Sequence, residues 1–258
     1  MLPWFQFISF RVGPFTIYVW GAMVALGILT GTWVAARFAK ARGQDPKLIW
    51  DTASVAALAG VVAARLAYVA FYNPAPYLAF PLRVFELWDG GMASMGAVVG
   101  ALVAALWFLR SRTVDVVAYM DTIAYGTPLA YGIGRIGCFL IHDHPGTLTH
   151  FLLGVKYPDG VRHDLGLYEM FNGFGLFLLF LVLRRCKVKP PTYAITFLIW
   201  YGAVRFLFDF LRAADPRYGG LTLAQYGCVG MFVVGLVWAG KRWRADKKDA
   251  LSAAKRRI

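Results

Sequence analysis

The sequence predicts an all-α, polytopic membrane protein with about seven transmembrane helices, and three observations support this class. Of the 258 residues, 59% are hydrophobic and only 16% are charged. The mean hydropathy of +0.56 is well above that of ordinary soluble domains. The apolar residues also form long runs without the polar stripes, at 3.6-residue spacing, that a soluble helix shows. A soluble helical bundle is therefore not expected.

Seven runs approach the roughly 20 apolar residues that a helix needs to cross a bilayer. In chain order they are residues 15–36, 48–72, 91–109, 114–141, 168–183, 192–211 and 223–240. The second, fourth and sixth runs end near Tyr72, His142 and Arg212, and the other four are each followed by basic residues. The first run lacks a preceding basic segment, so it is expected to be a retained span and not a cleaved signal peptide.

The formal charge of +13 is concentrated on one side of the predicted membrane. Clusters of lysine and arginine begin at Arg37, Arg110, Arg184 and Lys241, after the first, third, fifth and seventh runs. The positive-inside rule therefore places the N-terminus outside and the C-terminus in the cytoplasm. The basic tail, residues 241–258, is expected to contact anionic lipid heads or to be a solvated end. No nucleic-acid partner is expected.

The chain is expected to form a single integral membrane domain, residues 1–258, with an extracytoplasmic loop at about residues 142–167. This loop is the longest hydrophilic stretch of the sequence. The three cysteines, Cys138, Cys186 and Cys228, lie in or beside different helices and form no CxxC pair. Neither a disulfide framework nor a zinc knuckle is therefore expected, and no cofactor is expected.

Three arginines, Arg65, Arg135 and Arg205, lie inside apolar runs, where a charge is costly and usually faces a polar cavity or a partner. Each lies seven residues before the outer end of its run, which is roughly 10 Å along a helix. Guanidinium groups match phosphate oxygens in a bidentate way, so three at one depth predict a site for a phospholipid headgroup. The alternative is that each extends to the surface or pairs with a carboxylate such as Glu169 or Asp121.

Glycines accompany these arginines at two places in the sequence. Close helix packing would explain them, and so would the approach of a lipid headgroup to backbone amides. They are Gly132, Gly134 and Gly137 around Arg135, and Gly90, Gly91, Gly96 and Gly100 at the start of the third run.

Several motifs resemble those of the prolipoprotein diacylglyceryl transferase family, in the family's order and along nearly the whole chain. Residues 134–139, Gly-Arg-Ile-Gly-Cys-Phe, are similar to the G-R-x-G-N-F signature. Residues 65–73 resemble R-x-x-Y-V-x-F-Y-N, residues 88–92 resemble W-D-G-G-M, and residues 201–206 resemble Y-G-x-x-R-x. Arg162-His163 with Leu167-Tyr168-Glu169 is similar to R-H-P-x-Q-L-Y-E, and Gln225 corresponds to a glutamine that opens the last helix.

The resemblance implies an enzyme of the bacterial inner membrane that acts on phosphatidylglycerol and on prolipoprotein signal peptides. The diacylglyceryl group would pass to the thiol of a lipobox cysteine, giving a thioether and glycerol phosphate. Such a reaction needs donors for the negative charge that develops on the phosphate. By the family's pattern, Arg135 and Arg205 would hold this phosphate. The expected substrate-binding residues are Arg65, Gly91, Met95, Gly134, Gly137, Cys138, Tyr168, Glu169 and Tyr201.

The chain departs from the family's pattern at the expected base. Met95 stands where the family has a histidine, in a stretch reading S-F-H-G-G, and methionine cannot accept a proton. Cys138 replaces the asparagine of the signature, and Trp20 replaces a tyrosine in the first helix. The N-x-E that follows the signature is replaced by residues 142–146, His-Asp-His-Pro-Gly.

All four histidines, His142, His144, His150 and His163, fall in the outer loop. A relocated base is expected at His142 or His144, with Asp143 as a weaker candidate, because a histidine with a pKa of about 6.5 suits proton transfer. The alternative is that these are structural loop histidines. A zinc site formed by His142, Asp143 and His144 is another alternative, but their spacing is not helical, and no metal is expected.

Two other classes of function stay open from the sequence. A related enzyme that transfers a phospholipid headgroup to another acceptor would keep the arginines and change the loop that faces the acceptor. A lipid transporter, a scramblase or a catalytically inactive lipid-binding relative would not need the missing histidine. A transporter would more often show two similar halves, and the sequence has no obvious internal repeat.

Overall fold

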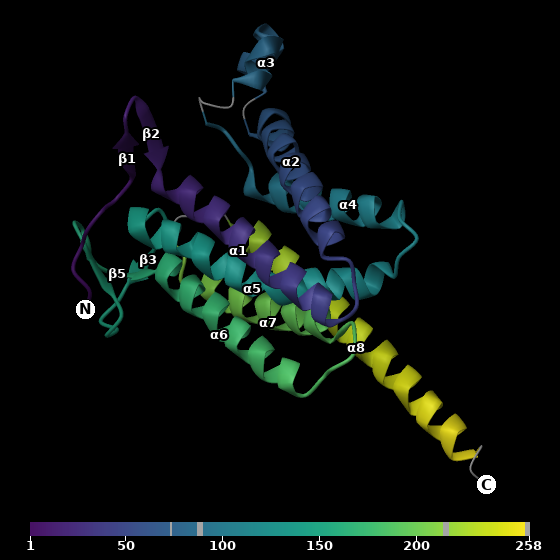
Figure 1. The fold of residues 1–258 in the computed structure, drawn as a ribbon. Helices are drawn as coiled ribbons and strands as arrows, with labels where there is room; N and C mark the ends of the chain where they lie inside the picture. The colour runs from purple at the N-terminus through teal and green to yellow at the C-terminus, as the bar shows by residue number, and fades with distance from the viewer. Residues whose placement is uncertain (73, 87–89, 214–216, 256–258) are drawn as a thin grey trace. The chain divides into compact units, whose positions relative to one another are not determined.

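The computed structural model of the chain is mainly helical (Figure 1). It describes residues 1–72, 74–86, 90–213 and 217–255, so Trp88 and Asp89 of the predicted motif lie outside the described residues. The chain divides into two compact units, one formed by Met1–Val34 and Met120–Ile258 and the other by Ala35–Tyr119. The single membrane domain stays a prediction.

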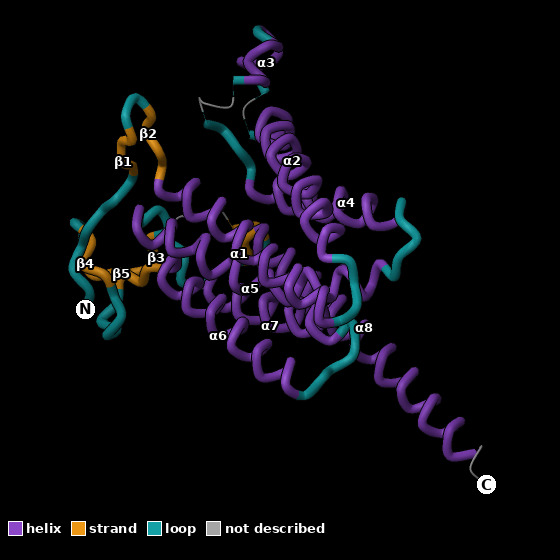
Figure 2. Tube along the Cα trace, in the orientation of Figure 1, coloured by secondary structure: helices purple, strands orange, loops and turns teal. Residues whose placement is uncertain are grey.

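The elements of the chain follow in order, with strands before the first helix and in two of the connections between later helices (Figure 2). They are β1 (Ser9–Val12), β2 (Phe15–Tyr18), α1 (Val19–Ala41), α2 (Pro46–Phe71), α3 (Ala75–Ala79), the 3-10 helix η1 (Pro81–Phe85), α4 (Ser94–Arg110), α5 (Val116–Ile141), β3 (Pro145–Leu148), β4 (Val155–Tyr157), β5 (Gly160–Asp164), α6 (Leu165–Arg185), α7 (Thr192–Asp209), β6 (Arg217–Tyr218), β7 (Leu221–Thr222) and α8 (Leu223–Lys255).

Each of the seven predicted spans coincides with one of the longer helices, in the predicted order. By length and composition, four helices of the described chain are apolar enough to cross a membrane, namely Val19–Ala41, Pro46–Phe71, Leu165–Arg185 and Leu223–Lys248. The chain is thus a helical membrane protein. The count of seven crossings and the orientation of the termini stay predictions.

The expectation of a purely helical chain needs two corrections. The first predicted span begins with strand β2, because Gly13 and Pro14 form a two-residue turn that pairs β1 with β2. Gly13 has a φ of 59°, the left-handed backbone that such a hairpin turn requires. The predicted outer loop also contains a three-stranded antiparallel sheet, in the order β3-β5-β4, and α6 already begins at Leu165. In addition, the basic tail is helical as far as Lys255.

Small residues let the helices of the first unit approach closely. α1, α5, α6 and α7 run side by side (Figure 1). A Cβ added to Gly27 of α1 would lie 2.5 Å from a backbone oxygen of α5, and one added to Gly173 of α6 would lie 2.7 Å from the Cα of Gly132 in α5. A Cβ on Gly202 of α7 would lie 2.8 Å from a backbone oxygen of α8. The expected packing role of Gly132 is therefore confirmed.

The three-stranded sheet closes the end of this unit where α5 ends and α6 begins (Figure 2). The N-terminal segment is attached to the sheet by backbone hydrogen bonds, from the Leu2 N–H to the Gly154 oxygen at 2.8 Å and from the Lys156 N–H to the Leu2 oxygen at 3.0 Å. Farther along, the Phe7 N–H donates to the Leu140 oxygen at 2.9 Å, near the end of α5. The sheet and the first residues thus fix the backbone around the end of α5.

In the second unit, α2 packs against α4 through glycine and alanine. A Cβ on Gly96 would lie 2.6 Å from the Ala63 backbone oxygen, and one on Gly100 would overlap the Ala63 Cβ. These glycines of the third predicted span therefore serve helix packing. The N-terminus of α2 is capped by Asp45, whose side chain accepts a hydrogen bond from the Lys47 N–H at 2.9 Å.

Candidate active site

Two of the three predicted arginines meet at one buried carboxylate. Glu169 of α6 is fully buried. Its Oε2 lies 2.6 Å from the Nε of Arg135 in α5, and its Oε1 lies 2.6 Å from a terminal nitrogen of Arg205 in α7. Three neighbouring helices therefore bring two guanidinium groups to opposite sides of the same carboxylate. The sequence alternative that Glu169 pairs with these arginines is confirmed.

Each of the two arginine helices also presents a tyrosine one turn before its arginine. The sequence Tyr-Gly-x-x-Arg occurs in α5, from Tyr131 to Arg135, and again in α7, from Tyr201 to Arg205. The Tyr131 hydroxyl donates to Glu169 Oε2 at 2.9 Å, and the two tyrosine rings meet edge to face with centroids 5.3 Å apart. The i, i+4 spacing places a tyrosine and an arginine on the same helix face, so both pairs face α6.

A second carboxylate, which the sequence analysis did not single out, extends this cluster. Asp209 is fully buried at the end of α7. Its Oδ1 lies 3.2 Å from Arg205 and 3.2 Å from the Nε of Arg212. The i, i+4 spacing from Arg205 to Asp209 and the i, i+3 spacing from Asp209 to Arg212 are the sequence signals that could have revealed it.

The cluster of Arg135, Glu169, Arg205, Asp209 and Arg212 is a network of ion pairs. Three guanidinium groups contact two carboxylates in these pairs. The Arg205 side chain is 8% exposed, whereas that of Arg135 is 19% exposed. Arg135 is therefore the more accessible of the two arginines that share Glu169.

A capping box holds the start of α8 against this cluster. The Thr222 N–H donates to Gln225 Oε1 at 2.9 Å, and the Gln225 N–H donates to Thr222 Oγ1 at 3.1 Å, the reciprocal pattern of a capping box. The Thr222 hydroxyl also donates to Asp209, and the Gln225 amide donates to the Phe206 backbone oxygen at 3.2 Å. Gln225 thus has a structural role that explains a glutamine at the start of the last helix.

Arg65 of α2 belongs to the second unit and is bound by backbone. Its Nε donates to the Val84 oxygen at 3.0 Å, and its terminal nitrogens donate to the oxygens of Arg83 at 2.7 Å, Glu86 at 3.0 Å and Gly91 at 3.2 Å. They also donate to the Gly90 oxygen. An arginine has five N–H donors, so these contacts account for all of them. This geometry favours a structural role, and phosphate binding by Arg65 stays a prediction.

His142 is enclosed by other side chains at the end of α5. Its side chain is fully buried, its ring stacks on Trp4 at 4.7 Å, and its Nδ1 lies 2.5 Å from Asp164 Oδ2. The other oxygen of Asp164 caps α6 by accepting from the Leu167 N–H at 2.9 Å, and Tyr157 donates to Asp164 at 2.8 Å. The ring has no exposed surface, and a role of His142 as the base stays a prediction. The structural alternative fits this position.

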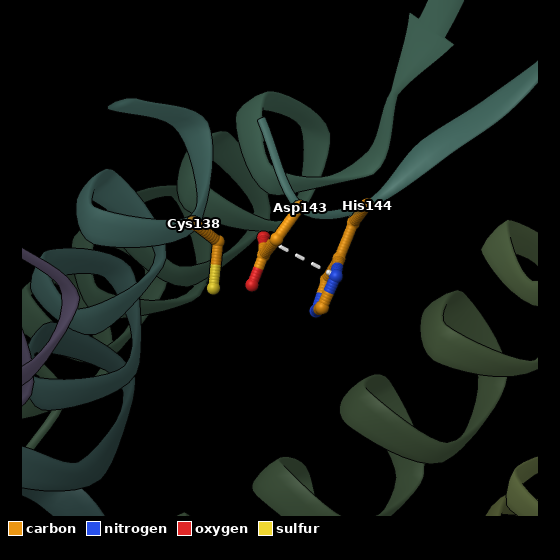
Figure 3. A group of neighbouring side chains, drawn as sticks. All are labelled: Cys138, Asp143 and His144. Carbon is orange, nitrogen blue, oxygen red and sulfur yellow. Dashed lines mark ion pairs between the residues drawn. The ribbon is translucent and has the colours of Figure 1, made fainter. Parts of the chain in front are cut away.

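His144 and Asp143 lie in the turn after α5 and keep part of their surface exposed. The His144 Nδ1 lies 3.2 Å from Asp143 Oδ1, and the two side chains are 24% and 34% exposed. Figure 3 shows both pointing toward Cys138, in the last turns of α5. Reactive atoms of Cys138, Asp143 and His144 all lie within 4.8 Å of one another. Of the three residues considered for a zinc site from the sequence, Asp143 and His144 lie beside Cys138, whereas the His142 ring contacts Asp164.

Cys138 also links this turn to the arginine cluster. A terminal nitrogen of Arg135 donates to the Cys138 sulfur at 3.5 Å, while the Nε of the same side chain contacts Glu169. A Cβ on Gly137 would lie 3.0 Å from the Trp20 Cα, whereas one on Gly134 has only Val24 within 4 Å. Gly137 therefore serves the packing of α5 on α1, whereas a Cβ on Gly134 would make an ordinary contact with α1.

A separate apolar groove of about 570 Å³ lies between α6, α7 and the outer sheet. Its lining includes Tyr168, Phe171, Trp200 and Phe208. At its edge, the His163 Nδ1 lies 2.8 Å from the Tyr168 hydroxyl. Burial lowers the pKa of His163 below its ordinary value, which keeps the ring neutral near pH 7. Tyr168 thus lines the groove, and its hydroxyl contacts His163.

The remaining predicted residues lie in the second unit or outside the sheet's core. Met95 is exposed on α4, and Gly91 has a φ of 74° and faces the Tyr68 ring, which a Cβ would meet at 2.5 Å. His150 is exposed in the loop between β3 and β4. Substrate binding by Met95 and Gly91 stays a prediction.

The fold and the site define an integral membrane protein whose helices bury two arginines on one carboxylate. A family model described as prolipoprotein diacylglyceryl transferase matches residues 7–240, so the chain belongs to this family. The resemblance of its motifs is thereby confirmed.

Relatives from several bacteria are similar to this chain over nearly its full length. A Brucella anthropi protein is 34% identical over 267 residues, which cover 95% of this chain and 94% of the relative. Proteins from Brucella ovis and Brucella melitensis biotype 2 are each 34% identical over 266 residues with the same coverage. All three relatives are named phosphatidylglycerol–prolipoprotein diacylglyceryl transferase.

Proposed function

We propose that this chain transfers the diacylglyceryl group of phosphatidylglycerol to the lipobox cysteine of a prolipoprotein signal peptide. The family membership and the names of relatives that match 95% of the chain support this activity. The observation that carries the mechanism is the pair of guanidinium groups on Glu169. The proposal includes seven crossings of the bacterial inner membrane, with the N-terminus outside and the C-terminus in the cytoplasm.

The two guanidinium groups on Glu169 suit the lipid phosphate. Phosphatidylglycerol carries one negative charge on its phosphodiester, and guanidinium groups bind phosphate oxygens in a bidentate way. Arg135 and Arg205 would bind the phosphate, while Glu169 holds their guanidinium groups in place without a ligand. Donors fixed before the reaction lower the barrier, because they need no rearrangement when the charge on the phosphate grows.

The reaction increases the charge on the phosphate. The thiolate sulfur of the peptide attacks the glyceryl carbon that bears the phosphate ester, and a carbon–sulfur bond forms as the carbon–oxygen bond breaks. The electron pair of the broken bond stays on the phosphate oxygen, so glycerol phosphate leaves with two negative charges. The two arginines therefore bind the leaving group more strongly than the substrate, which is the condition for accelerating the step.

The proton of the peptide thiol must leave before or during the attack. Met95 cannot accept it, and the ring of His142 is enclosed. The partly exposed Asp143-His144 turn, one residue beyond α5 and joined to Arg135 through Cys138, is the part of the site that fits this task. In the absence of a metal ion, Asp143 would orient the His144 ring as the base, as a carboxylate orients a catalytic histidine in other enzymes.

The activity can be tested with purified protein in detergent, phosphatidylglycerol and a lipobox peptide. Transfer is expected to raise the mass of the peptide by one diacylglyceryl group, and a peptide with serine in place of its cysteine should gain none. A wild-type protein that binds the lipid but modifies no peptide would remove the proposal.

Variants of the arginines test the site itself. Arg135→Lys and Arg205→Lys should each lower kcat/KM for the lipid about 10- to 100-fold, because hydrogen bonds to charged groups contribute about 1.5–3 kcal/mol. Arg11→Lys, on the exposed strand β1, is the matched control and should leave the rate unchanged. Wild-type rates in both active-site variants would place the phosphate elsewhere.

One observation favours a second candidate function. Met95 and the Asp143-His144 turn both lie at positions where the chain departs from the family's pattern. A headgroup transferase with another acceptor would keep the arginine cluster and alter these positions. It would leave the lipobox peptide unmodified in the same assay, and with its own acceptor present it would transfer glycerol phosphate to that acceptor and release diacylglycerol.

A further inference from the structure

We propose that Cys138, Asp143 and His144 form a zinc site that binds the thiol of the incoming peptide as a thiolate. The role in transfer rests on the proposed function, whereas the binding of the metal does not. The site combines the three zinc-ligand types, sulfur, nitrogen and carboxylate oxygen, in one short segment of the chain.

The geometry of the three side chains is close to that of a zinc site. Their ligand atoms lie within 4.8 Å of one another. Zinc lies about 2.3 Å from sulfur and about 2.0–2.2 Å from nitrogen or oxygen, so ligand atoms on a tetrahedron are roughly 3.3–3.6 Å apart. A contraction of about 1 Å is enough to bind the ion. Asp143 and His144 are partly exposed, so their side chains have room to make this adjustment.

The backbone explains why these residues meet. α5 ends at Ile141, and the next residue, His142, has a φ of 52°, a left-handed conformation that few non-glycine residues adopt. This turn directs Asp143 and His144 back toward Cys138 in the last turns of α5 (Figure 3). The bond of the His142 ring to Asp164 fixes the turn from behind. His142 is thus a positioning residue for the ligand set.

The surroundings of the sulfur suit a metal-bound thiolate. A terminal nitrogen of Arg135 donates to the Cys138 sulfur at 3.5 Å, a contact that a thiolate accepts more strongly than a thiol does. Two ionised ligands, the Cys138 thiolate and the Asp143 carboxylate, match the two positive charges of zinc. Donors around a metal site of this kind orient the ligands and tune their basicity.

Three protein ligands leave the fourth position of a tetrahedral zinc ion open, as in catalytic zinc sites. A peptide thiol that enters this position loses its proton, because a thiol coordinated to zinc is deprotonated outright. The proton passes to solvent. The thiolate sulfur then attacks the glyceryl carbon, and glycerol phosphate leaves. Zinc keeps its oxidation state, and no further reactant is needed.

This site accounts for two departures from the family's pattern together. Met95 provides no base, and a metal-bound thiolate does not require one. Cys138 stands where the signature has an asparagine, which is a poor zinc ligand, and it lies beside the arginine that is proposed to bind the phosphate. Nucleophile and leaving group would therefore be held by adjacent side chains.

Metal binding can be measured without any transfer assay. The full chain in detergent is treated with a chelator, desalted and titrated with Co²⁺ and then with Zn²⁺. One ion per chain is expected, with a thiolate-to-cobalt charge-transfer band that zinc removes. Cys138→Ser and His144→Gln should lose the band, whereas Cys186→Ser, at the exposed end of α6, should keep it. Wild-type protein without the band would overturn the proposal, whatever the stability of the variants.

The role of the metal is then measured with the lipid and the lipobox peptide. Chelation should abolish transfer by the wild type, and stoichiometric Zn²⁺ should restore it. Full transfer by metal-free protein that still depends on His144 would overturn the zinc proposal and leave the transferase intact, with His144 acting as a simple base. A protein that binds one zinc ion at Cys138 but modifies no lipobox peptide would support the metal site and contradict the transferase.

Discussion

Glu169→Gln is the variant that most directly tests the arginine cluster. The carboxylate is fully buried and lies 2.6 Å from each of two guanidinium groups. With charge centres about 4 Å apart and an effective dielectric constant of about 20, each pair contributes about 4 kcal/mol. The cost of burying the carboxylate offsets several kcal/mol of this sum. The loss on neutralisation is therefore expected to be about 3–5 kcal/mol, the range found when one partner of a buried ion pair is removed.

The assay compares the free energy of unfolding of both proteins in the same detergent, followed by circular dichroism. Asp159→Asn is the matched control, because Asp159 pairs with Arg162 on the exposed surface of the outer sheet and its loss should change stability little. The transfer rate of Glu169→Gln should fall as well, since Arg135 and Arg205 lose their common anchor. A variant that is as stable as the control would refute the argument that Glu169 holds the two arginines together.

Three further predictions concern packing and pH. Gly173→Ala should destabilise the protein by about 1–3 kcal/mol, since its methyl group would overlap the backbone of α5. Gly175→Ala is the control and should not destabilise it, because a Cβ added there has no neighbouring atom within 4 Å. Thermal unfolding compares the two variants. His142→Ala should cost about 2–3 kcal/mol by leaving a buried carboxylate without its ring partner, and His150→Ala should cost little; equal stabilities would contradict the structural role. Burial lowers the pKa of His163 in the folded protein, so the unfolded chain binds the proton more readily. The free energy of unfolding should therefore fall as the pH drops below about 6.5 and through the lower folded pKa. His163→Gln should flatten this part of the pH–stability curve, and an unchanged slope would contradict the prediction.

The arginines show where the sequence was informative and where it was not. A charge inside an apolar run indicates a polar site, and this was enough to single out Arg135 and Arg205. Equal distances from the helix ends did not reveal that Arg65 is occupied by backbone carbonyls, which depend on how the chain folds between α2 and α4. The three arginines have the same position in their apolar runs, but Arg135 and Arg205 contact a carboxylate whereas Arg65 contacts backbone oxygens.

The histidines show the same limit at shorter range. His142 and His144 are separated by one residue, and both are equally suited to proton transfer by residue type. The left-handed backbone at His142 turns one ring inward to Asp164 and leaves the other partly exposed beside Cys138. A dihedral angle of a non-glycine residue is not readable from the sequence, because its cost is offset only by contacts made in the folded protein.

By itself, the sequence determined the helical membrane class and the family, because apolar runs of bilayer length and ordered motifs are properties of the chain that do not depend on its fold. Only the tertiary structure decided which charges share a carboxylate, which histidine is enclosed, and that Cys138 joins Asp143 and His144. These outcomes depend on distances of a few ångströms between side chains of different helices and turns. Such distances are set by helix packing and by the backbone conformation at the helix ends.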